Sequence, residues 1–115
     1  MEFSIIIPTI NNLKYLKLVI KSLIKNSKFE HEIIVHLNGD DSDTLDYLKK
    51  FKIKYTTTKT NVGLCSGVNL ATKISNKDYI VYAHDDMYFL PGWDLELKKN
   101  IDEIGHNKFY LSCSH

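Results

Sequence analysis

The chain contains the stretch Tyr79-Ile80-Val81-Tyr82-Ala83-His84-Asp85-Asp86-Met87, in which an apolar run meets two adjacent carboxylates. The apolar run predicts a buried strand. Ionised carboxylates beside such a strand repel each other unless a cation or hydrogen-bond donors stabilise them. Mg²⁺ and Mn²⁺ take oxygen ligands and are commonly held by one or two carboxylates together with substrate phosphates. Asp85 and Asp86 therefore indicate a metal site for a nucleotide diphosphate; a solvated turn or a cap on the following helix is the alternative.

The rest of the chain alternates between strand and helix patterns. Strands are predicted at residues 3–7, 32–37, 53–57, 78–83 and 108–113, and helices at about residues 13–24, 44–51, 61–74 and 90–104. Parallel neighbours need crossover connections, so this alternation predicts an α/β, Rossmann-like fold with a mainly parallel open sheet and helices on both faces. Residues 1–115 form a single domain in this interpretation.

The loops that follow the predicted strands carry most of the unusual polar residues. They comprise residues 8–12, 38–43, 60–63 and 84–88. Ligands of open parallel sheets bind beyond the carboxyl ends of the strands, at one edge of the sheet. The sequence therefore predicts one ligand site that is built from these four loops.

Composition narrows the class of ligand. The 115 residues carry a net charge of +1, and the 15 Lys and Arg residues are all Lys, which gives no reason to expect nucleic acid as a partner. No apolar run approaches the roughly 20 residues that span a bilayer, and no cleavable signal is recognisable. Cys65 and Cys113 are the only cysteines, which argues against a disulfide scaffold or a zinc site. We expect a cytoplasmic protein that is peripheral to a membrane only through a partner.

Four motifs and a following segment occur in order along these elements: Ser4-Ile5-Ile6-Ile7-Pro8-Thr9-Ile10-Asn11, Asn38-Gly39, Asn61-Val62-Gly63-Leu64-Cys65-Ser66-Gly67-Val68-Asn69, His84-Asp85-Asp86-Met87 and Pro91-Gly92-Trp93. Together they resemble the inverting family 2 glycosyltransferases, which have the glycosyltransferase A-type fold. The resemblance covers nearly the whole chain and corresponds to the nucleotide-sugar-binding half of a typical member. It implies that a sugar is transferred from a nucleotide diphosphate sugar, expected to be a uridine diphosphate sugar, to a sugar or lipid-linked hydroxyl acceptor.

The resemblance assigns the metal to the fourth motif, which stands where the family carries its Asp-x-Asp sequence. Asp86 would ligate the Mn²⁺ or Mg²⁺ that bridges the diphosphate. Asp85 and His84 would lie near the ribose or assist the metal shell. Such a metal neutralises charge on the departing diphosphate. His84 stands where the family more commonly has Asp or Asn, and a packed or solvated histidine is the alternative.

The resemblance places the nucleobase beside the first loop, which consists of Pro8, Thr9, Ile10 and Asn11. The Thr9 hydroxyl or a backbone amide would contact the base, although the loop also fits a simple strand end. Asn38 has a donor and an acceptor that suit a uracil-like edge. The Asp that the family usually carries before this Asn is Leu37 here. Asp40 or Asp41 is the candidate substitute, and a solvated turn with a helix cap is the alternative.

The third motif begins a predicted helix and contributes Asn61 and Gly63 to the expected nucleotide site. Gly63 allows a sharp turn or a close approach to a ligand, Asn61 is suited to cap the helix, and free amides at a helix start favour anionic groups. Gly67 and Asn69 are expected to serve helix packing and a buried hydrogen bond. Cys65 is expected to be a small core residue.

The resemblance leaves the catalytic base unassigned, because family members usually place it after the fifth strand and the chain reaches only His115. The acids of the last predicted helix fit a solvated face better than general-base catalysis; they are Asp94, Glu96, Asp102 and Glu103. Trp93 would stack on an acceptor sugar or anchor packing. An open sheet edge and uncovered apolar surface would favour a homo-oligomer.

Two other functions fit parts of the pattern. A non-catalytic nucleotide-sugar-binding or assembly module would keep the fold and lack the acceptor half. A phospho-receiver-like signalling domain has a similar length and five alternating strands. That class carries its acidic pair after the first strand and its phosphoacceptor Asp after the third, where this chain has Pro8-Thr9 and Thr58-Lys59. The glycosyltransferase interpretation is therefore preferred.

Overall fold

A computed structural model describes residues 2–104 and 110–112, and side chains up to residue 102. In chain order the elements are β1 (Phe3–Thr9), α1 (Leu13–Asn26), β2 (Glu32–Asn38), α2 (Ser42–Lys50), β3 (Lys54–Thr58), α3 (Leu64–Thr72), β4 (Tyr79–Tyr82), α4 (Trp93–Ile104) and β5 (Tyr110–Ser112). The predicted alternation of strands and helices is confirmed. The predicted strand at 108–113 appears as β5, and residues 108, 109 and 113 lie outside the described part of the chain.

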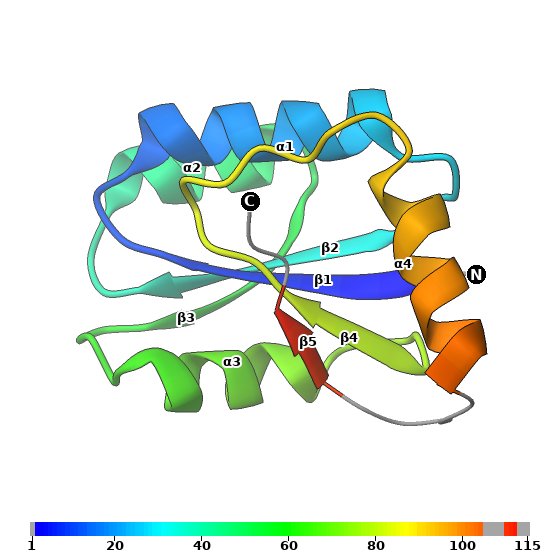
Figure 1. The fold of residues 1–115 in the computed structure, drawn as a ribbon. Coiled ribbons are helices and arrows are strands. Elements are labelled where there is room, and N and C mark those ends of the chain that lie inside the picture. The colour runs from blue at the N-terminus through cyan, green and yellow to red at the C-terminus, as the bar shows by residue number, and fades with distance from the viewer. Residues whose placement is uncertain (1, 105–109, 113–115) are drawn as a thin grey trace.

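The described strands form one parallel sheet in the order β3-β2-β1-β4-β5 (Figure 1). From β1 the chain moves through β2 to β3 on one side, and β4 and β5 then add on the other side of β1. The connections thus change direction between β1 and β4. In sheets of this kind, a crevice for ligands opens at that switch point, beyond the carboxyl ends of the strands.

Helices cover both faces of the sheet, as predicted. In Figure 1, α1 and α2 lie on one face and α3 on the other. Successive side chains of a strand point to opposite faces. Ile5 and Ile7 of β1 therefore pack in the core beneath α1 and α2, whereas Ile6 packs with Val68 and Ala71 of α3. Because both faces are covered, β1 is buried along its whole length, which explains the apolar run Ile5-Ile6-Ile7-Pro8 within it.

Helix α3 packs closely on the sheet at Gly67. A Cβ atom built at Gly67 would lie 2.7 Å from Cδ2 of His36, so only glycine fits without displacing the buried imidazole. Nδ1 of His36 lies 2.7 Å from the Thr56 hydroxyl oxygen on the neighbouring strand. The prediction that Gly67 serves helix packing is confirmed.

Helix α4 lies at the edge of the sheet where the strands begin (Figure 1). Its residue Asp94 is fully buried and accepts hydrogen bonds from the backbone N–H groups of Lys28 and Phe29, at 2.7 and 2.8 Å. Nε2 of His31 lies 2.8 Å from the same carboxylate oxygen, and Nδ1 of His31 accepts the N–H of Phe3. Nε2 therefore carries a proton and donates to Asp94. The expectation of a solvated Asp94 is wrong, because these three donors replace water.

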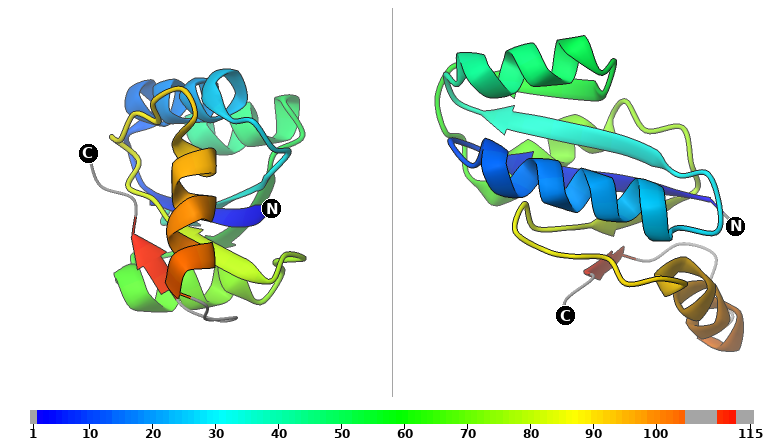
Figure 2. Two further views of the ribbon diagram at one scale, coloured as in Figure 1. Left: turned by 45° about the vertical axis from the view of Figure 1, so that its right-hand side comes forward. Right: turned by 90° about the horizontal axis from the view of Figure 1, so that it is seen from above.

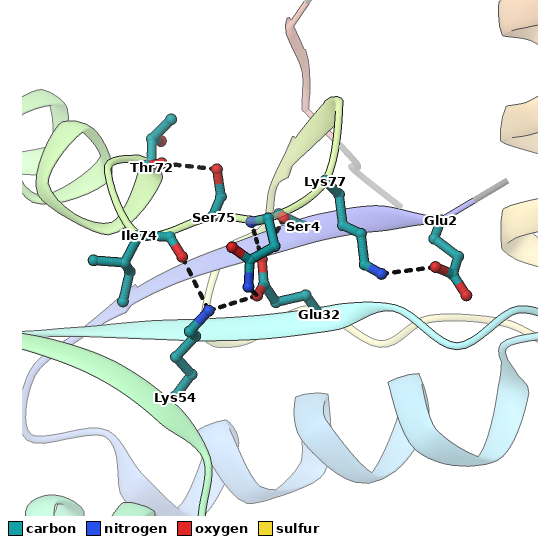
Figure 3. Close-up of polar contacts among 9 residues, drawn as sticks. Glu2, Ser4, Glu32, Lys54, Thr72, Ile74, Ser75 and Lys77 are labelled. Atoms are coloured by element: carbon teal, nitrogen blue, oxygen red, sulfur yellow. Dashed lines mark hydrogen bonds and ion pairs between the residues drawn. The ribbon is translucent and has the colours of Figure 1, made fainter.

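A second polar cluster ties three strands together around Glu32 of β2 (Figure 3). The Glu32 carboxylate accepts hydrogen bonds from the Ser4 hydroxyl at 2.6 Å, from Nζ of Lys54 at 2.7 Å and from the backbone N–H of Asn76 at 2.8 Å. Nζ of Lys54 also donates to the Ile74 carbonyl. The cluster therefore joins β1, β2, β3 and the turn that leads into β4.

Candidate functional site

The loops at the switch point are joined by a hydrogen bond between Thr9 and Asp85. Oγ1 of Thr9, at the end of β1, donates to Oδ2 of Asp85 at 2.7 Å, and Asp85 lies in the turn that follows β4. The two strands pair directly, from Phe3 opposite Tyr79 to Ile6 opposite Tyr82. Thr9 is 4% exposed and Asp85 is half-buried. The Asp85 carboxylate is therefore held in place at the crevice.

Asp86 follows in the same tight turn, and its side chain is exposed. The turn is closed by a hydrogen bond from the N–H of Met87 to the carbonyl of His84. Helix α4 begins only at Trp93, so neither carboxylate caps it, and that alternative is wrong. One fixed carboxylate and one exposed carboxylate therefore stand next to each other at the switch point.

His84 is exposed beside Tyr82, a residue that the sequence did not single out. Nδ1 of His84 lies 3.3 Å from the Tyr82 hydroxyl oxygen, and the two ring centroids are 4.9 Å apart. Burial raises the pKa of the Tyr82 hydroxyl, and the charge of Asp85 raises it further. The hydroxyl therefore keeps its proton. Tyr82 and His84 are two positions apart in the sequence. Residues at that spacing share one face of an extended chain, and this spacing could have indicated their contact.

The loop after β1 is locked to the loop after β2. Asn11 adopts a left-handed conformation, with a φ of 50°, and its N–H donates to Oδ2 of Asp41 at 2.9 Å. Asp41 also caps α2 by accepting hydrogen bonds from the N–H and the hydroxyl of Thr44. Burial alone would raise the pKa of Asp41, but the hydrogen bonds from Thr44 and Asn11 lower it below its ordinary value. Asp41 is the predicted helix cap, and it also holds the first loop.

A close contact reinforces the same junction. At Gly39 the φ is 141°, and an added Cβ atom would lie 3.0 Å from Cδ1 of Ile10. Leu37, which precedes the Asn38-Gly39 motif, is 2% exposed, whereas Asp40 is exposed. Leu37 therefore belongs to the interior, and Asp40 is the carboxylate of this loop that faces outward.

Asn38 holds the third loop. Its side chain is buried, and its Nδ2 donates to Oδ1 of Asn61 at 2.9 Å and to the carbonyl of Gly63 at 3.4 Å. Its Oδ1 accepts the N–H of Val62 at 2.9 Å and the hydroxyl of Thr58 at 3.3 Å. Donor and acceptor are thus both engaged within the protein, and the Asn38 side chain fixes the turn that leads into α3.

That turn ends at Gly63, which is the N-cap of α3 and has a φ of 85°. The expectation that Asn61 caps the helix is wrong, because Oδ1 of Asn61 accepts the N–H of Gly63 at 2.8 Å, one position before the helix begins. Cys65 and Asn69 are exposed, so the expectations of a core cysteine and a buried asparagine are also wrong. Both side chains lie on the outer face of α3.

A depression of about 370 Å³ lies beside these loops, at the carboxyl ends of β2 and β3. Its walls include Gly39, Asp40, Asp41, Thr58 and Lys59. It therefore borders the second loop on one side and the end of β3 on the other.

Within the part of the chain that the structure describes, no three His, Cys, Asp or Glu side chains come together as a metal-binding group. The switch point offers the two carboxylates of Asp85 and Asp86. Oxygen ligands of this kind suit hard cations, which are commonly held by one or two carboxylates together with substrate phosphates. The donor set therefore fits Mg²⁺ or Mn²⁺ in the presence of a diphosphate.

Trp93 lies at the opposite edge of the sheet and serves packing. Its ring centroid is 4.7 Å from that of Phe89 and 5.1 Å from that of His31, and its Nε1 donates to the Ser27 hydroxyl at 2.9 Å.

The described helices include none that is long and apolar enough to cross a membrane.

Comparisons with known proteins agree with the fold and the motifs. The sequence pattern of the family described as Glycosyl transferase family 2 matches residues 4–113. A comparison with curated protein sequences found no match. The family match over residues 4–113 gives no support to the phospho-receiver alternative.

Solved structures of S. aureus TarS resemble the chain. The crystal structure of TarS residues 1–349 is 27% identical with a TM-score of 0.77, and the match covers 90% of this chain and 33% of that one. The same fragment in complex with UDP-GlcNAc is 27% identical with a TM-score of 0.77, covering 90% and 32%. TarS itself is 28% identical with a TM-score of 0.75, covering 90% and 20%. The chain thus spans about a third of the TarS fragment, and it belongs to glycosyl transferase family 2.

Proposed function

We propose that the chain binds a nucleotide diphosphate sugar at the switch point and serves inverting transfer of the sugar to a hydroxyl acceptor. The observation that carries the proposal is the hydrogen bond from Thr9 to Asp85, which joins the loops after β1 and β4 next to the exposed Asp86. The similar TarS fragment has been crystallised with UDP-GlcNAc and with UDP, which supports a uridine diphosphate sugar as the ligand.

Asp86 and Asp85 would hold the divalent cation, Mn²⁺ or Mg²⁺, and Thr9 would orient Asp85. When bound, the cation supplies positive charge that stabilises the departing nucleotide diphosphate. The Thr9 hydroxyl fixes one carboxylate oxygen of Asp85, so the other oxygen remains for ligation. His84, exposed beside Tyr82, is placed to reach a ribose hydroxyl.

The backbone N–H groups at the start of α3 would receive a phosphate. The first N–H groups of a helix have no partner within it, and they favour anions. Asn38 and Asn61 act indirectly here, because their side chains fix the turn at Gly63. Asn38 is thus proposed as a positioning residue instead of a contact to the base.

The nucleobase would lie against the first loop, Pro8 to Asn11, and the neighbouring depression. Leu37 is buried and Asp41 is engaged with Thr44 and Asn11. Asp40 is the exposed carboxylate of the second loop, and it is our candidate for a contact to the base.

Residues 1–115 would act as one nucleotide-sugar-binding domain, with the acceptor and the catalytic base supplied from outside the described residues. The described acids of α4 lie at the far edge of the sheet, where the strands begin, so none of them is proposed as the base (Figure 1). Cytoplasmic location and self-association remain predictions.

Calorimetric titration with UDP, with and without Mn²⁺, tests the proposal. We expect binding that requires Mn²⁺, that is lost in Asp86→Asn and that is retained in Asp78→Asn, a matched exposed acid before β4. Metal-independent binding, or no binding by a folded sample, would contradict the proposal.

A non-catalytic nucleotide-sugar-binding or assembly module is the second candidate, and the position of the described α4 acids at the far edge of the sheet is compatible with it (Figure 1). It shares the binding site and differs only in turnover. Release of free sugar from UDP-GlcNAc by the purified chain, abolished by Asp86→Asn, would exclude the non-catalytic module.

A further inference from the structure

The outward face of α1 carries a row of lysines. Lys14, Lys17, Lys21 and Lys25 follow one another at spacings of three or four residues, and Lys28 continues the row just beyond the helix; all five are exposed. Residues three or four apart share one face of a helix. Helix α1 contains no Asp or Glu. A third of the chain's 15 lysines therefore lie on one strip of a protein whose net charge is +1.

Large apolar side chains flank this row instead of entering the core. Ile24 is 72% exposed, Leu18 is 49% exposed and Tyr15 is 48% exposed. The opposite face of α1, with Leu16, Val19, Ile20 and Leu23, is the one that packs on the sheet. Packing of the fold therefore does not explain the apolar residues on this outward, basic face of α1.

The segment after β4 extends the same surface. Residues 84–91 run beside α1 (Figure 2). Nδ2 of Asn26 donates to the carbonyl of Phe89 at 2.7 Å, and the N–H of Phe89 donates to the Ser22 hydroxyl at 3.0 Å. Tyr88 and Leu90, on either side of this anchored residue, are 49% and 63% exposed. We call the lysine row together with Tyr15, Leu18, Ile24, Tyr88 and Leu90 the basic–apolar surface.

Among the described residues, acidic groups approach this surface near its two ends. Asp43 and Asp46 of α2 line a shallow depression together with Lys17, and Glu30 lines a cavity together with Ile24 and Lys28. Asp85 and Asp86 lie at the start of the segment after β4. The middle of the row, around Lys21 and Lys25, is accordingly the most positive part.

Charge and chemistry favour an anionic lipid bilayer as the partner. Lysine side chains can lay their apolar stems along a membrane interface while their ammonium groups meet lipid phosphates. Exposed aliphatic and tyrosine side chains beside them gain free energy by entering the interface. A nucleic acid partner would favour Arg, which the chain lacks.

We propose that the basic–apolar surface docks directly on anionic membranes, with no transmembrane helix and no partner protein. The surface is continuous with the candidate site at two points. Helix α1 directly follows the loop that contains Asn11, and the segment 84–91 contains Asp85 and Asp86 near its start. Docking would place the switch point beside the lipid headgroups. This last consequence rests on the proposed function, and it would suit a lipid-linked hydroxyl acceptor.

Flotation of the purified chain with vesicles tests the docking. We expect binding to vesicles of phosphatidylcholine and phosphatidylglycerol, weak binding to phosphatidylcholine alone, and release by high salt. Each lysine near an anionic surface is worth about a fivefold change in partitioning. The triple variant Lys21→Gln, Lys25→Gln, Lys28→Gln should therefore partition about a hundredfold less.

A matched control triple, Lys52→Gln, Lys73→Gln, Lys99→Gln, removes the same charge from exposed positions elsewhere on the chain and should partition nearly as the parent chain does. Ile24→Ser with Leu90→Ser tests the apolar part and should weaken binding at low salt, where the parent chain binds, although the lysines are kept. Equal losses in both lysine triples, no vesicle binding by a folded sample, or binding of single-stranded RNA that competes with vesicles at equal strength would each overturn the proposal. UDP titration of the same samples separates this outcome from failure of the nucleotide site.

Discussion

Thr9 and Asp85 are 76 positions apart in the sequence, yet the hydroxyl of the first donates to the carboxylate of the second at 2.7 Å. The hydrogen bond forms because β1 and β4 are adjacent parallel strands in which Ile6 lies opposite Tyr82, and Thr9 and Asp85 each follow that pair by three residues. It converts a flexible aspartate in a turn into a carboxylate of defined position at the place where the sheet changes direction.

Thr9→Val should weaken nucleotide binding with little effect on the fold. Valine keeps the shape of threonine but cannot donate to Asp85. Hydrogen bonds to charged groups contribute about 1.5–3 kcal/mol, so we expect a loss of about 10- to 100-fold in Mn²⁺-dependent affinity for UDP. Calorimetry measures the affinity, and Thr72→Val, at the last residue of α3 and away from the four loops, is the control. Unchanged affinity in Thr9→Val would show that Asp85 needs no such support.

Asn38→Ala should loosen the turn that precedes α3. The change removes the acceptor of the Val62 N–H and the donor to Asn61. Val62 and Asn61 are exposed, so water can replace Asn38, and each lost hydrogen bond should cost about 0.5–1.5 kcal/mol. We expect faster hydrogen exchange at Val62 and Gly63 together with weaker UDP binding. Asn69→Ala, on the exposed face of α3, should leave both unchanged.

Gly67→Ala should destabilise the protein although alanine favours helices. The new methyl group would lie 2.7 Å from Cδ2 of His36, and overpacking of this kind costs about 1–3 kcal/mol, more than the helix propensity returns. Urea unfolding gives the difference in the free energy of unfolding. Ser66→Ala, at the preceding exposed position, should be neutral or slightly stabilising.

Loss of stability at acidic pH should depend on Asp94 and His31. Burial lowers the pKa of His31, which outweighs the opposing effect of Asp94, so the folded protein keeps this imidazole neutral. Burial alone would raise the pKa of Asp94, but the N–H groups of Phe29 and Lys28 and the His31 ring lower it. Both groups therefore stabilise the fold above their unfolded pKa values, and both contributions are lost as the pH falls toward the lower folded values.

Asp94→Asn should accordingly cost about 3 kcal/mol at neutral pH and flatten the fall in stability below about pH 4, the ordinary pKa of an aspartate in the unfolded chain. Urea unfolding from neutral pH down through that range measures both effects. Glu96→Gln, an exposed acid on the same helix, should keep the slope of the parent chain. A variant Asp94→Asn with the unaltered slope would assign the acid sensitivity to other groups.

Much of the fold was predictable because its signals are local. The unbroken apolar run of β1 reflects burial on both faces, and the spacing of Leu16, Val19, Ile20 and Leu23 reflects the buried face of α1. Alternation of such segments leaves few arrangements other than a parallel sheet. The gathering of four loops at one edge follows from that topology, while the roles of their residues remain predictions.

The errors concern side chains whose partners lie far away in the sequence. Asp94 looks solvated on a helix of mixed polarity, and only the fold brings it to the N–H groups of Lys28 and Phe29. The partners of Asn38 in the turn at residues 61–63 are likewise distant in the sequence, and its predicted contact to a base stays a prediction. Neither pairing leaves a periodic trace in the sequence, so local patterns could not reveal it.

The Asp94–His31 pair fastens the edge where the strands begin, and every loop of the candidate site stands at the other edge. The protein thereby separates its mechanical anchor from its recognition loops. If the loops bind a sugar nucleotide as we propose, substitutions in them would alter ligand preference without loosening the contacts of Asp94 and His31, and one scaffold could then diversify its ligands.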